Sequence, residues 1–195
     1  MVKVACVLLT LNEEADIEEC LRHLRPYVDY MLVLDAESSD ATVDIAKRVA
    51  DAVVVKKSSG SFSIDKNYAW SLIPADCDWV LWADPDEKWD WDFLNNIKNK
   101  VLEAGKSGVY AFRFPRVNLP DCKDWPDYQL RFVKNDPSKF EWRGNVDEVL
   151  WWKTQNVPLD QADREDLKER LGVGEASDHP IVHLKRLEDK RRKWW

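Results

Sequence analysis

The sequence lacks the features that mark several classes of protein. No apolar run approaches the roughly 20 residues that a membrane-spanning helix needs. The apolar start of the chain, "MVKVACVLL", has no small-residue cleavage site after it, so it predicts a first strand and not a signal peptide. The four cysteines stand in no CxxC or other metal-ligand spacing. We therefore expect a globular protein with reduced, structural thiols and a cytoplasmic location.

Positive charge is also scarce. The chain has 29 Lys and Arg against 36 Asp and Glu, a formal net charge of -7. Because phosphate backbones are held by clustered basic residues, we expect no nucleic-acid partner. The exception is the tail "HLKRLEDKRRKWW", which predicts either a weak peripheral contact with an anionic membrane surface or a solvated helix end. The sequence carries no signal for an oligomeric state.

Strand-like and helix-like segments alternate through the first half of the chain. Apolar runs of strand length are followed by segments with apolar residues at helical spacing, such as Ile17, Leu21 and Leu24 behind a possible cap at Asn12. This alternation predicts right-handed crossovers and a mostly parallel α/β sheet with helices on both faces. The expected strands are 2–9, 30–35, 51–56 and 77–84, and the expected helices lie within 10–28, 38–50 and 62–75.

The pattern changes after residue 92. We expect a helix over 92–105, strands over 108–117 and 128–135, and a short aromatic segment at 139–152. The polar stretch 153–178 predicts a helix between mobile loops, which is typical of a lid.

An acidic cluster follows the fourth expected strand, in "WVLWADPDEKWDWD". Asp84, Asp86 and Glu87 repel one another unless a cation lies between them. Mg²⁺, Mn²⁺ and Ca²⁺ prefer carboxylate oxygens, and two Asp spaced one apart can both reach a metal from a strand-end turn. The alternative is a solvated acidic turn beside a helix N-terminus.

Two other strand ends carry polar residues. Thr10 and Asn12 follow the first strand, and Asp35 ends the second, with Ser38 shortly after it. In parallel α/β sheets, ligands bind beyond the carboxyl ends of the strands. These residues and the acidic cluster should therefore meet at one edge of the sheet. The 11 tryptophans add a little weight to a sugar or nucleotide ligand, because indole rings stack on both.

Four segments in this order resemble the family 2 glycosyltransferases of the GT-A fold. They are "VLLTLNEEADIEECLRHL", "LVLDAESSDATVDIAKRVAD", "FSIDKNYAWSLIPADCDWVLWADPDE" and "YQLRFVK...FEWRGNVDEVL". More closely, they resemble the small subgroup that includes lipopolysaccharide-core glucosyltransferases. The resemblance implies a Rossmann-like sheet with a nucleotide-binding half at about 1–105 and a smaller, mixed acceptor half at about 106–152. Residues 153–195 would then form a C-terminal lid and a basic, aromatic tail.

The resemblance also implies a donor, which is a nucleotide-diphosphate sugar, most often a UDP-sugar and otherwise a GDP-sugar. Thr10, Leu11, Asn12 and Glu13 match the loop that lines the base and ribose, and Asp35 matches the acidic residue that binds the nucleoside.

Two basic positions match residues near the donor's diphosphate. Lys66 and Asn67 match an Arg-Asn pair on the third helix, although Lys66 is equally consistent with a solvated helix lysine. Arg131 matches the "QxR" of a later strand. It would steady the phosphates, fix the catalytic base or form a strand-end salt bridge.

The metal motif is matched by Asp84 and Asp86, with an acidic residue after them at Glu87. The implied ion is Mn²⁺ or Mg²⁺, which neutralises the leaving diphosphate. Asp86 would bind it directly, and Asp84 would bind through water or hold the ribose. His183 resembles a later family histidine and is either a third ligand or an ordinary histidine.

Direct, inverting displacement at the anomeric carbon needs a general base for the acceptor's hydroxyl proton. Asp147 and Glu148 match a His-Glu pair near the acceptor, which would be a glycan, a lipid-linked glycan or a protein. Their alternative is an exposed turn. Trp89, Trp91 and Trp142 would form an acceptor platform or pack in the core.

Several residues depart from the family pattern, and three other functions remain to be compared. Glu37 and Ala41 replace glycines, Lys66 replaces Arg, Asp147 replaces His, and Pro85 lies inside the metal motif. These changes are compatible with an inactive GT-A scaffold that only binds nucleotide or sugar.

A nucleotidyltransferase would need a Gly-rich, basic loop after the first strand, which "TLNEEAD" does not provide. A receiver-like signalling domain would lack the aromatic second half. We therefore expect a metal-dependent hexosyltransferase.

Overall fold

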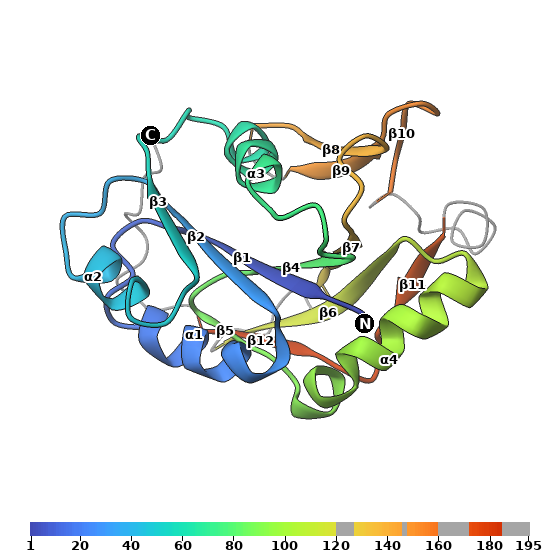
Figure 1. Cartoon of the computed structure of the whole chain (residues 1–195), viewed down its shortest axis with the longest axis horizontal. Helices are drawn as coiled ribbons and strands as arrows, with labels where there is room; N and C mark the ends of the chain where they lie inside the picture. Colours follow the sequence, from blue (N-terminus) through green and yellow to red (C-terminus); the bar gives the residue numbers. More distant parts are fainter. Residues whose placement is uncertain (120–126, 146–147, 160–171, 185–195) are drawn as a thin grey trace.

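The computed structural model describes residues 1–119, 127–145, 148–159 and 172–184. Its described residues form a curved sheet of nine strands and a separate sheet of three strands (Figure 1). None of the helices in these ranges is both long and apolar enough to cross a membrane.

The first half of the chain alternates strands with helices, as expected. All seven residues of the first strand are buried, as befits a strand covered on both faces. The elements are β1 (Val4–Thr10), α1 (Ile17–Leu24), the 3₁₀ helix η1 (Arg25–Tyr27), β2 (Tyr30–Asp35), α2 (Thr42–Ala46), β3 (Ala52–Val55), α3 (Phe62–Ser71) and β4 (Trp79–Ala83).

The second half adds short strands around one long helix. The elements are β5 (Glu87–Lys88), α4 (Trp91–Ser107), β6 (Ala111–Leu119), β7 (Asp127–Lys134), β8 (Phe140–Arg143), β9 (Val149–Trp152), β10 (Val157–Pro158), β11 (Val173–Glu175) and β12 (Ile181–Leu184). The helix α4 is capped at both ends. The Asp90 carboxylate accepts a hydrogen bond from the backbone N–H of Phe93, and Gly108 ends the helix in the left-handed conformation.

The strand order of the large sheet is β3-β2-β1-β4-β7-β6-β12-β5, and β11 pairs with β6. The first four strands are parallel, whereas β7 runs antiparallel to both β4 and β6. The chain moves from β1 toward β2 and β3 on one side and places β4 on the other. The carboxyl ends of β1 and β4 therefore flank a topological switch point, which is where open α/β sheets bind ligands.

Side chains alternate between the two faces of the sheet and build two cores. Val4, Cys6 and Leu8 of β1 face the core under α1 and α4, whereas Ala5 and Val7 face the core under α3 and the small sheet. Figure 1 shows α1 and α4 on one side of the sheet and α3 with β8, β9 and β10 on the other. The expectation of cover on both faces is confirmed, with a small sheet in place of a second helix on one side.

The structure differs from the expected elements in three places. The first helix begins at Ile17 after Asp16, not after Asn12, which lies in the preceding turn with φ 56°. The helix expected over 38–50 is only Thr42–Ala46, because the chain turns to start β3 at Ala52, opposite Leu32 of β2. Strands β11 and β12 belong to the large sheet, whereas the sequence predicts a lid and a tail in this part of the chain. Residues 160–171 and 185–195, where the rest of the lid and tail fall, lie outside the described residues.

Candidate functional site

The ends of β1 and β2 are tied together by the first predicted nucleoside residues. Thr10 and Asp35 lie opposite each other in the parallel pair, and neither side chain is exposed. The Thr10 hydroxyl donates to Asp35 Oδ2 at 2.8 Å, and Ser38 donates its backbone N–H to Oδ1 and its hydroxyl to Oδ2. In this arrangement Asp35 organises the loop, and its buried carboxylate already accepts three hydrogen bonds.

The loop after β1 is bonded to the loop after β2. Asn12 is exposed and accepts a hydrogen bond from the backbone N–H of Ser39 at 2.8 Å. The buried Glu13 donates its N–H to the hydroxyl of Thr42 at 2.7 Å. Leu11 is half-buried beside them. The structure thus brings the predicted loop residues to the same edge of the sheet as Asp35.

Glu37 occupies a position where the family pattern has glycine. The φ of Glu37 is 62°, in the left-handed region that glycine adopts without steric cost. Ala41 replaces the other glycine at φ -78°, where any L-residue is accommodated. Only the first replacement therefore strains the backbone.

A narrow gap lies beside this loop, and in this structure it has no room for a water molecule. Its lining combines apolar and polar side chains: Leu9, Leu34, Ala36, Lys56, Ser58 and Asp65. Asp65 accepts hydrogen bonds from Lys56 Nζ and Ser58 Oγ, both at 2.9 Å. The sequence interpretation missed Lys56, Ser58 and Asp65, because no local motif links the end of a strand to the start of the next helix.

The acidic cluster after β4 is organised by Arg131. Its guanidinium Nη2 lies 2.5 Å from Asp84 Oδ2 and 2.6 Å from Glu87 Oε1. Arg131 is 4% exposed and Glu87 is fully buried. Glu87 also accepts the backbone N–H of Asp84 through Oε2 at 3.1 Å. Of the three roles considered for Arg131, the structure shows the salt bridge, which joins the middle of the sheet to the metal motif.

The two carboxylates on Arg131 respond oppositely to this environment. Burial raises the pKa of Glu87 to about 7, and the negative charge of Asp84 adds to the shift against the opposing effect of Arg131. For Asp84, burial also favours the neutral form, but the charges of Arg131 and Lys66 outweigh it and lower the pKa. Asp84 is therefore held as a carboxylate.

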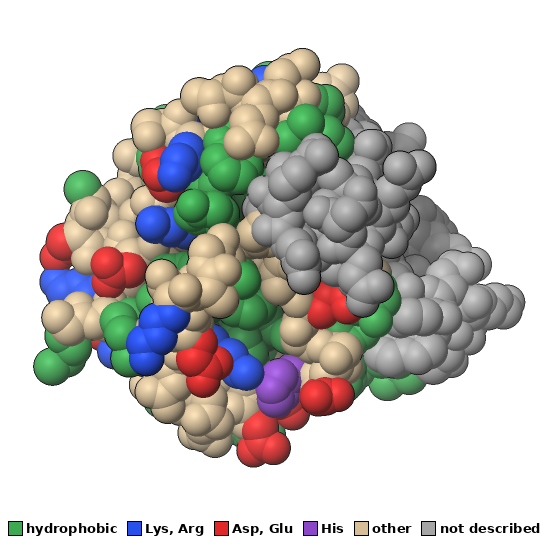
Figure 2. Space-filling view, turned by 90° about the vertical axis from the view of Figure 1, so that its right-hand side faces the viewer, with side chains coloured by type: hydrophobic (Ala, Val, Ile, Leu, Met, Phe, Trp, Pro, Cys, Tyr) green, Lys and Arg blue, Asp and Glu red, His purple; other side chains and the backbone are tan. Residues whose placement is uncertain are grey.

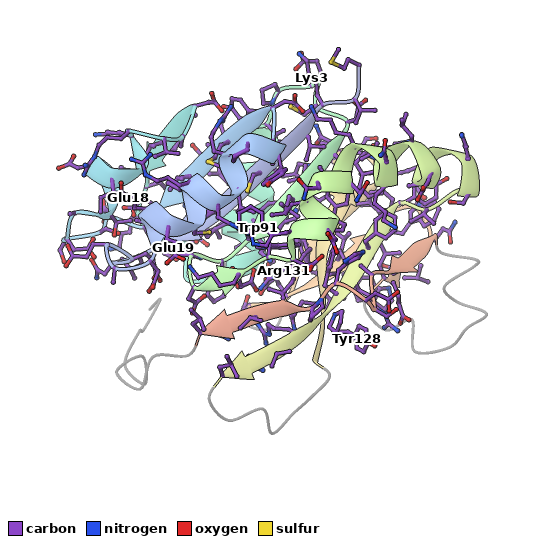
Figure 3. The ribbon with its side chains drawn as sticks, turned by 90° about the horizontal axis from the view of Figure 1, so that it is seen from below. Lys3, Glu18, Glu19, Trp91, Tyr128 and Arg131 are labelled. Atoms are coloured by element: carbon purple, nitrogen blue, oxygen red, sulfur yellow. The ribbon has the colours of Figure 1, made fainter. Side chains whose placement is uncertain are left out.

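Asp86 lies beside His183, which the sequence separates from it by 97 positions. Asp86 Oδ2 is 3.0 Å from His183 Nε2, and His183 Nδ1 is 2.9 Å from Asn118 Oδ1. Strand β12 places His183 beside Asp86, because β12 pairs with β5 on one side and with β6 on the other. Figure 3, seen from below, labels Arg131 near the centre of the molecule.

Asp86 and His183 fit a divalent ion whose other coordination positions are filled by waters or substrate phosphates. Among the described residues, no three His, Cys, Asp or Glu side chains converge as a ready-made metal cage. Asp86 and His183 nevertheless place a carboxylate oxygen and an imidazole nitrogen at the separation of neighbouring ligands. Mg²⁺ typically takes one or two carboxylates, with waters and substrate phosphates in the remaining positions. Asp84 is engaged by Arg131 through Oδ2, which fits an indirect role better than a direct one.

Lys66 forms an ion pair with Glu148. The ammonium group also lies 4.2 Å from the ring centre of Trp142 and 5.5 Å from that of Trp82. With 5% of its surface exposed, Lys66 is not the solvated lysine of the alternative interpretation. Asp147, the other predicted base, lies outside the described residues.

Figure 2 shows one face of the molecule on which acidic and basic side chains gather around a histidine.

The three tryptophans proposed as an acceptor platform do not form one surface. Trp89 and Trp142 are 3% and 2% exposed and pack in the cores. Trp91 is 57% exposed at the start of α4 (Figure 3). Its ring forms a T-shaped contact with that of His23 on α1, with the ring centres 4.2 Å apart. Core packing therefore describes Trp89 and Trp142.

Solved structures of other proteins identify the fold of this chain. Glucosyl-3-phosphoglycerate synthase from Mycobacterium tuberculosis, in complex with Mn²⁺, UDP and glucosyl-3-phosphoglycerate, is 16% identical, with a TM-score of 0.62 over 97% of this chain and 74% of that one. Mannosyl-3-phosphoglycerate synthase from Rubrobacter xylanophilus is 20% identical, with a TM-score of 0.51 over 62% of this chain and 42% of that one. At these identities the likeness shows the fold, which is a GT-A α/β fold with a mixed, curled sheet.

The sequence match is more specific. Glycosyl transferase family 2 matches residues 6–152, and the chain belongs to this family. An uncharacterized glycosyltransferase of Rickettsia typhi is 35% identical over 113 residues, which are 58% of this chain and 38% of the relative. One of Rickettsia bellii is 32% identical over 142 residues, which are 67% of this chain and 47% of the relative. The chain thus spans less than half the length of these curated relatives.

Proposed function

We propose that this chain transfers a sugar from a nucleotide-diphosphate donor to an acceptor hydroxyl, with Mn²⁺ or Mg²⁺ and inversion at the anomeric carbon. The observation that carries the proposal is the convergence of Asp86 and His183, 3.0 Å apart, at the carboxyl edge of a family 2 sheet. Membership of the family and the Mn²⁺ and UDP in a solved structure of the same fold support it.

Each group of residues has one task in this proposal. The loops after β1 and β2 receive the nucleoside, most simply uridine and otherwise guanosine. Asp86 and His183 hold the metal ion, which when bound neutralises charge on the leaving diphosphate. Arg131 fixes Asp84 next to them.

Glu148 and Asp147 are the proposed bases for the acceptor's hydroxyl proton. Glu148 is paired with Lys66 and 17% exposed, so it is accessible to an acceptor at the edge of the site. A carboxylate can accept the hydroxyl proton through the oxygen that is not paired with Lys66, and accepting this proton is what direct displacement requires of the base. The acceptor is proposed to be a hydroxyl of a glycan, a lipid-linked glycan or a protein.

Calorimetry tests the donor site. UDP and GDP would be titrated with and without Mn²⁺ into the wild-type chain, into Asp86→Ala and into Asp92→Ala, which removes an exposed carboxylate on α4. We expect one nucleotide to bind only with Mn²⁺, and only Asp86→Ala to lose it. Failure of the wild-type chain to bind either nucleotide would overturn the proposal.

Transfer or hydrolysis of a labelled nucleotide sugar then separates an enzyme from an inactive scaffold. Nucleotide binding without turnover of any donor sugar would favour the scaffold. That outcome is relevant because Asp35 and Lys66 are both engaged by other side chains in the structure.

A further inference from the structure

The two ring nitrogens of His183 face different kinds of partner. Nδ1 lies 2.9 Å from the amide oxygen of Asn118, and Nε2 lies 3.0 Å from a carboxylate oxygen of Asp86. The side chain is 16% exposed, so solvent does little to choose between its tautomers. The hydrogen bonds of the histidine therefore decide which nitrogen carries the proton.

An amide oxygen only accepts hydrogen bonds, so Nδ1 must donate to Asn118. A neutral imidazole has one N–H, which leaves the lone pair of Nε2 directed toward Asp86. A carboxylate is also an acceptor, so Nε2 and Asp86 at 3.0 Å repel unless the ring carries a second proton or a cation lies between or beside them. The arrangement thus predisposes Nε2 and Asp86 to share a metal ion.

We propose that Asn118 is a positioning residue for the metal site, which fixes His183 in the Nδ1–H tautomer and aims Nε2 at the ion. This inference rests on the proposed function. The contact is set by the sheet, because Asn118 and His183 lie opposite each other in the parallel pair of β6 and β12. The other side of β12 pairs with β5, and Leu184 N–H donates to the Asp86 carbonyl at 2.9 Å. Both groups around the ion are thereby held by the same strand.

Two substitutions distinguish positioning from packing. Asn118→Leu removes the acceptor at similar volume, whereas Asn118→Asp keeps an oxygen at the same place. Mn²⁺ affinity would be measured without nucleotide, from the electron paramagnetic resonance signal of the free ion. We expect Asn118→Leu to weaken binding about 10–100-fold, as is usual for partners of metal ligands. Asn118→Asp should bind at least as tightly as the wild-type chain.

A second readout uses Mg²⁺, which is diamagnetic. Nitrogen-15 spectra of the protein saturated with Mg²⁺ should show the Nδ1–H form of His183 in the wild-type chain and in Asn118→Asp. In Asn118→Leu the Nε2–H form should appear, because Nδ1 then has no acceptor whereas Nε2 still faces Asp86.

The control is Asn135→Leu, which removes an amide that accepts from Trp70 Nε1 at 2.7 Å, away from the acidic cluster. It should lower stability without changing Mn²⁺ affinity. An unchanged affinity in Asn118→Leu, with a wild-type chain that binds Mn²⁺, would overturn the role of Asn118 alone. A wild-type chain that binds no Mn²⁺ would overturn the metal site together with this role.

Discussion

Glu87 has none of its surface exposed and lies between Arg131 and the turn that carries Asp84 and Asp86. Three charges in so small a volume are costly unless they compensate one another. The single guanidinium of Arg131 pairs with the carboxylates of both Asp84 and Glu87, so the three side chains together carry one net negative charge when both carboxylates are ionised. This net negative charge makes the pKa of Glu87 sensitive to its surroundings and can attract a cation to the edge of the site.

The first prediction concerns pH. The folded-state pKa of Glu87 is raised from 4.5 to about 7, so between these values the folded chain retains a proton that the unfolded chain has lost. This contribution to stability is fully present below pH 4.5 and is lost as the pH rises through 7. Glu87→Gln does not titrate. In EDTA, its free energy of unfolding relative to the wild-type chain should rise by about 3 kcal/mol between pH 5 and pH 8.

Urea denaturation at the two pH values measures this difference. Asp84 does not interfere, because its lowered pKa places its own transition below this window. Glu18→Gln, on the surface of α1, is the matched control and should give the same difference at both values. A Glu87→Gln variant that behaves like this control would contradict the assignment.

At the scale of elements, α3 is fastened to β8 by side chain and backbone. Asn67 donates Nδ2–H to the Trp142 carbonyl at 2.8 Å and accepts the Trp142 N–H at 2.9 Å. The backbone of Phe62 also donates to the Asn145 carbonyl. We call the two hydrogen bonds between Asn67 and Trp142 the clamp. Because Lys66 precedes Asn67 and lies over the Trp142 ring, the clamp also fixes the position of Lys66 beside Glu148.

The second prediction is that Asn67→Ala destabilises the fold. It removes two hydrogen bonds and leaves two backbone groups of Trp142 without these partners, which should cost about 2–4 kcal/mol. Asn96→Ala, at an exposed position of α4, should change stability by less than about 0.5 kcal/mol. Urea denaturation followed by tryptophan fluorescence measures both variants. Equal losses in the two would argue against a clamp.

At the scale of the whole molecule, the site draws on both halves of the sheet. The loops after β1 and β2 come from the parallel half, whereas Arg131 and His183 come from strands added later in the chain. Phe93 of α4 packs against Trp89, Phe114 and Phe132, so one aromatic core supports the strands around the acidic cluster. A ligand bound at this edge would therefore stabilise the molecule as a unit.

The third prediction follows from that linkage. At a nucleotide concentration 100 times its dissociation constant, binding adds about 2.7 kcal/mol to the free energy of unfolding. For a domain of this size the Tm should rise by about 5–10 °C. We expect this shift only when Mn²⁺ and UDP or GDP are added together, and not in Asp86→Ala. Calorimetric melting of the two proteins provides the measurement, and an equal shift in both would place the nucleotide elsewhere.

Local pattern was enough to predict much of the fold. The alternation of apolar runs with helical spacing located β1 to β4, α1 and α3, since burial on both faces leaves near-continuous apolar strands. The acidic cluster stood out because Asp84, Asp86 and Glu87 are adjacent in sequence. The loops at 10–13 and 35–38 were also identifiable, since each follows a strand.

The sequence by itself determined which strands form and which end of the sheet carries the polar residues, because both depend on neighbours along the chain. Only the tertiary structure decided the partners of those residues. Arg131 joins Glu87, Lys66 joins Glu148, and Asn118 joins His183 across separations that no local period records. The last of these pairs depends on the insertion of β12 between β5 and β6 and on the register of that pairing, which the packing of the whole sheet sets.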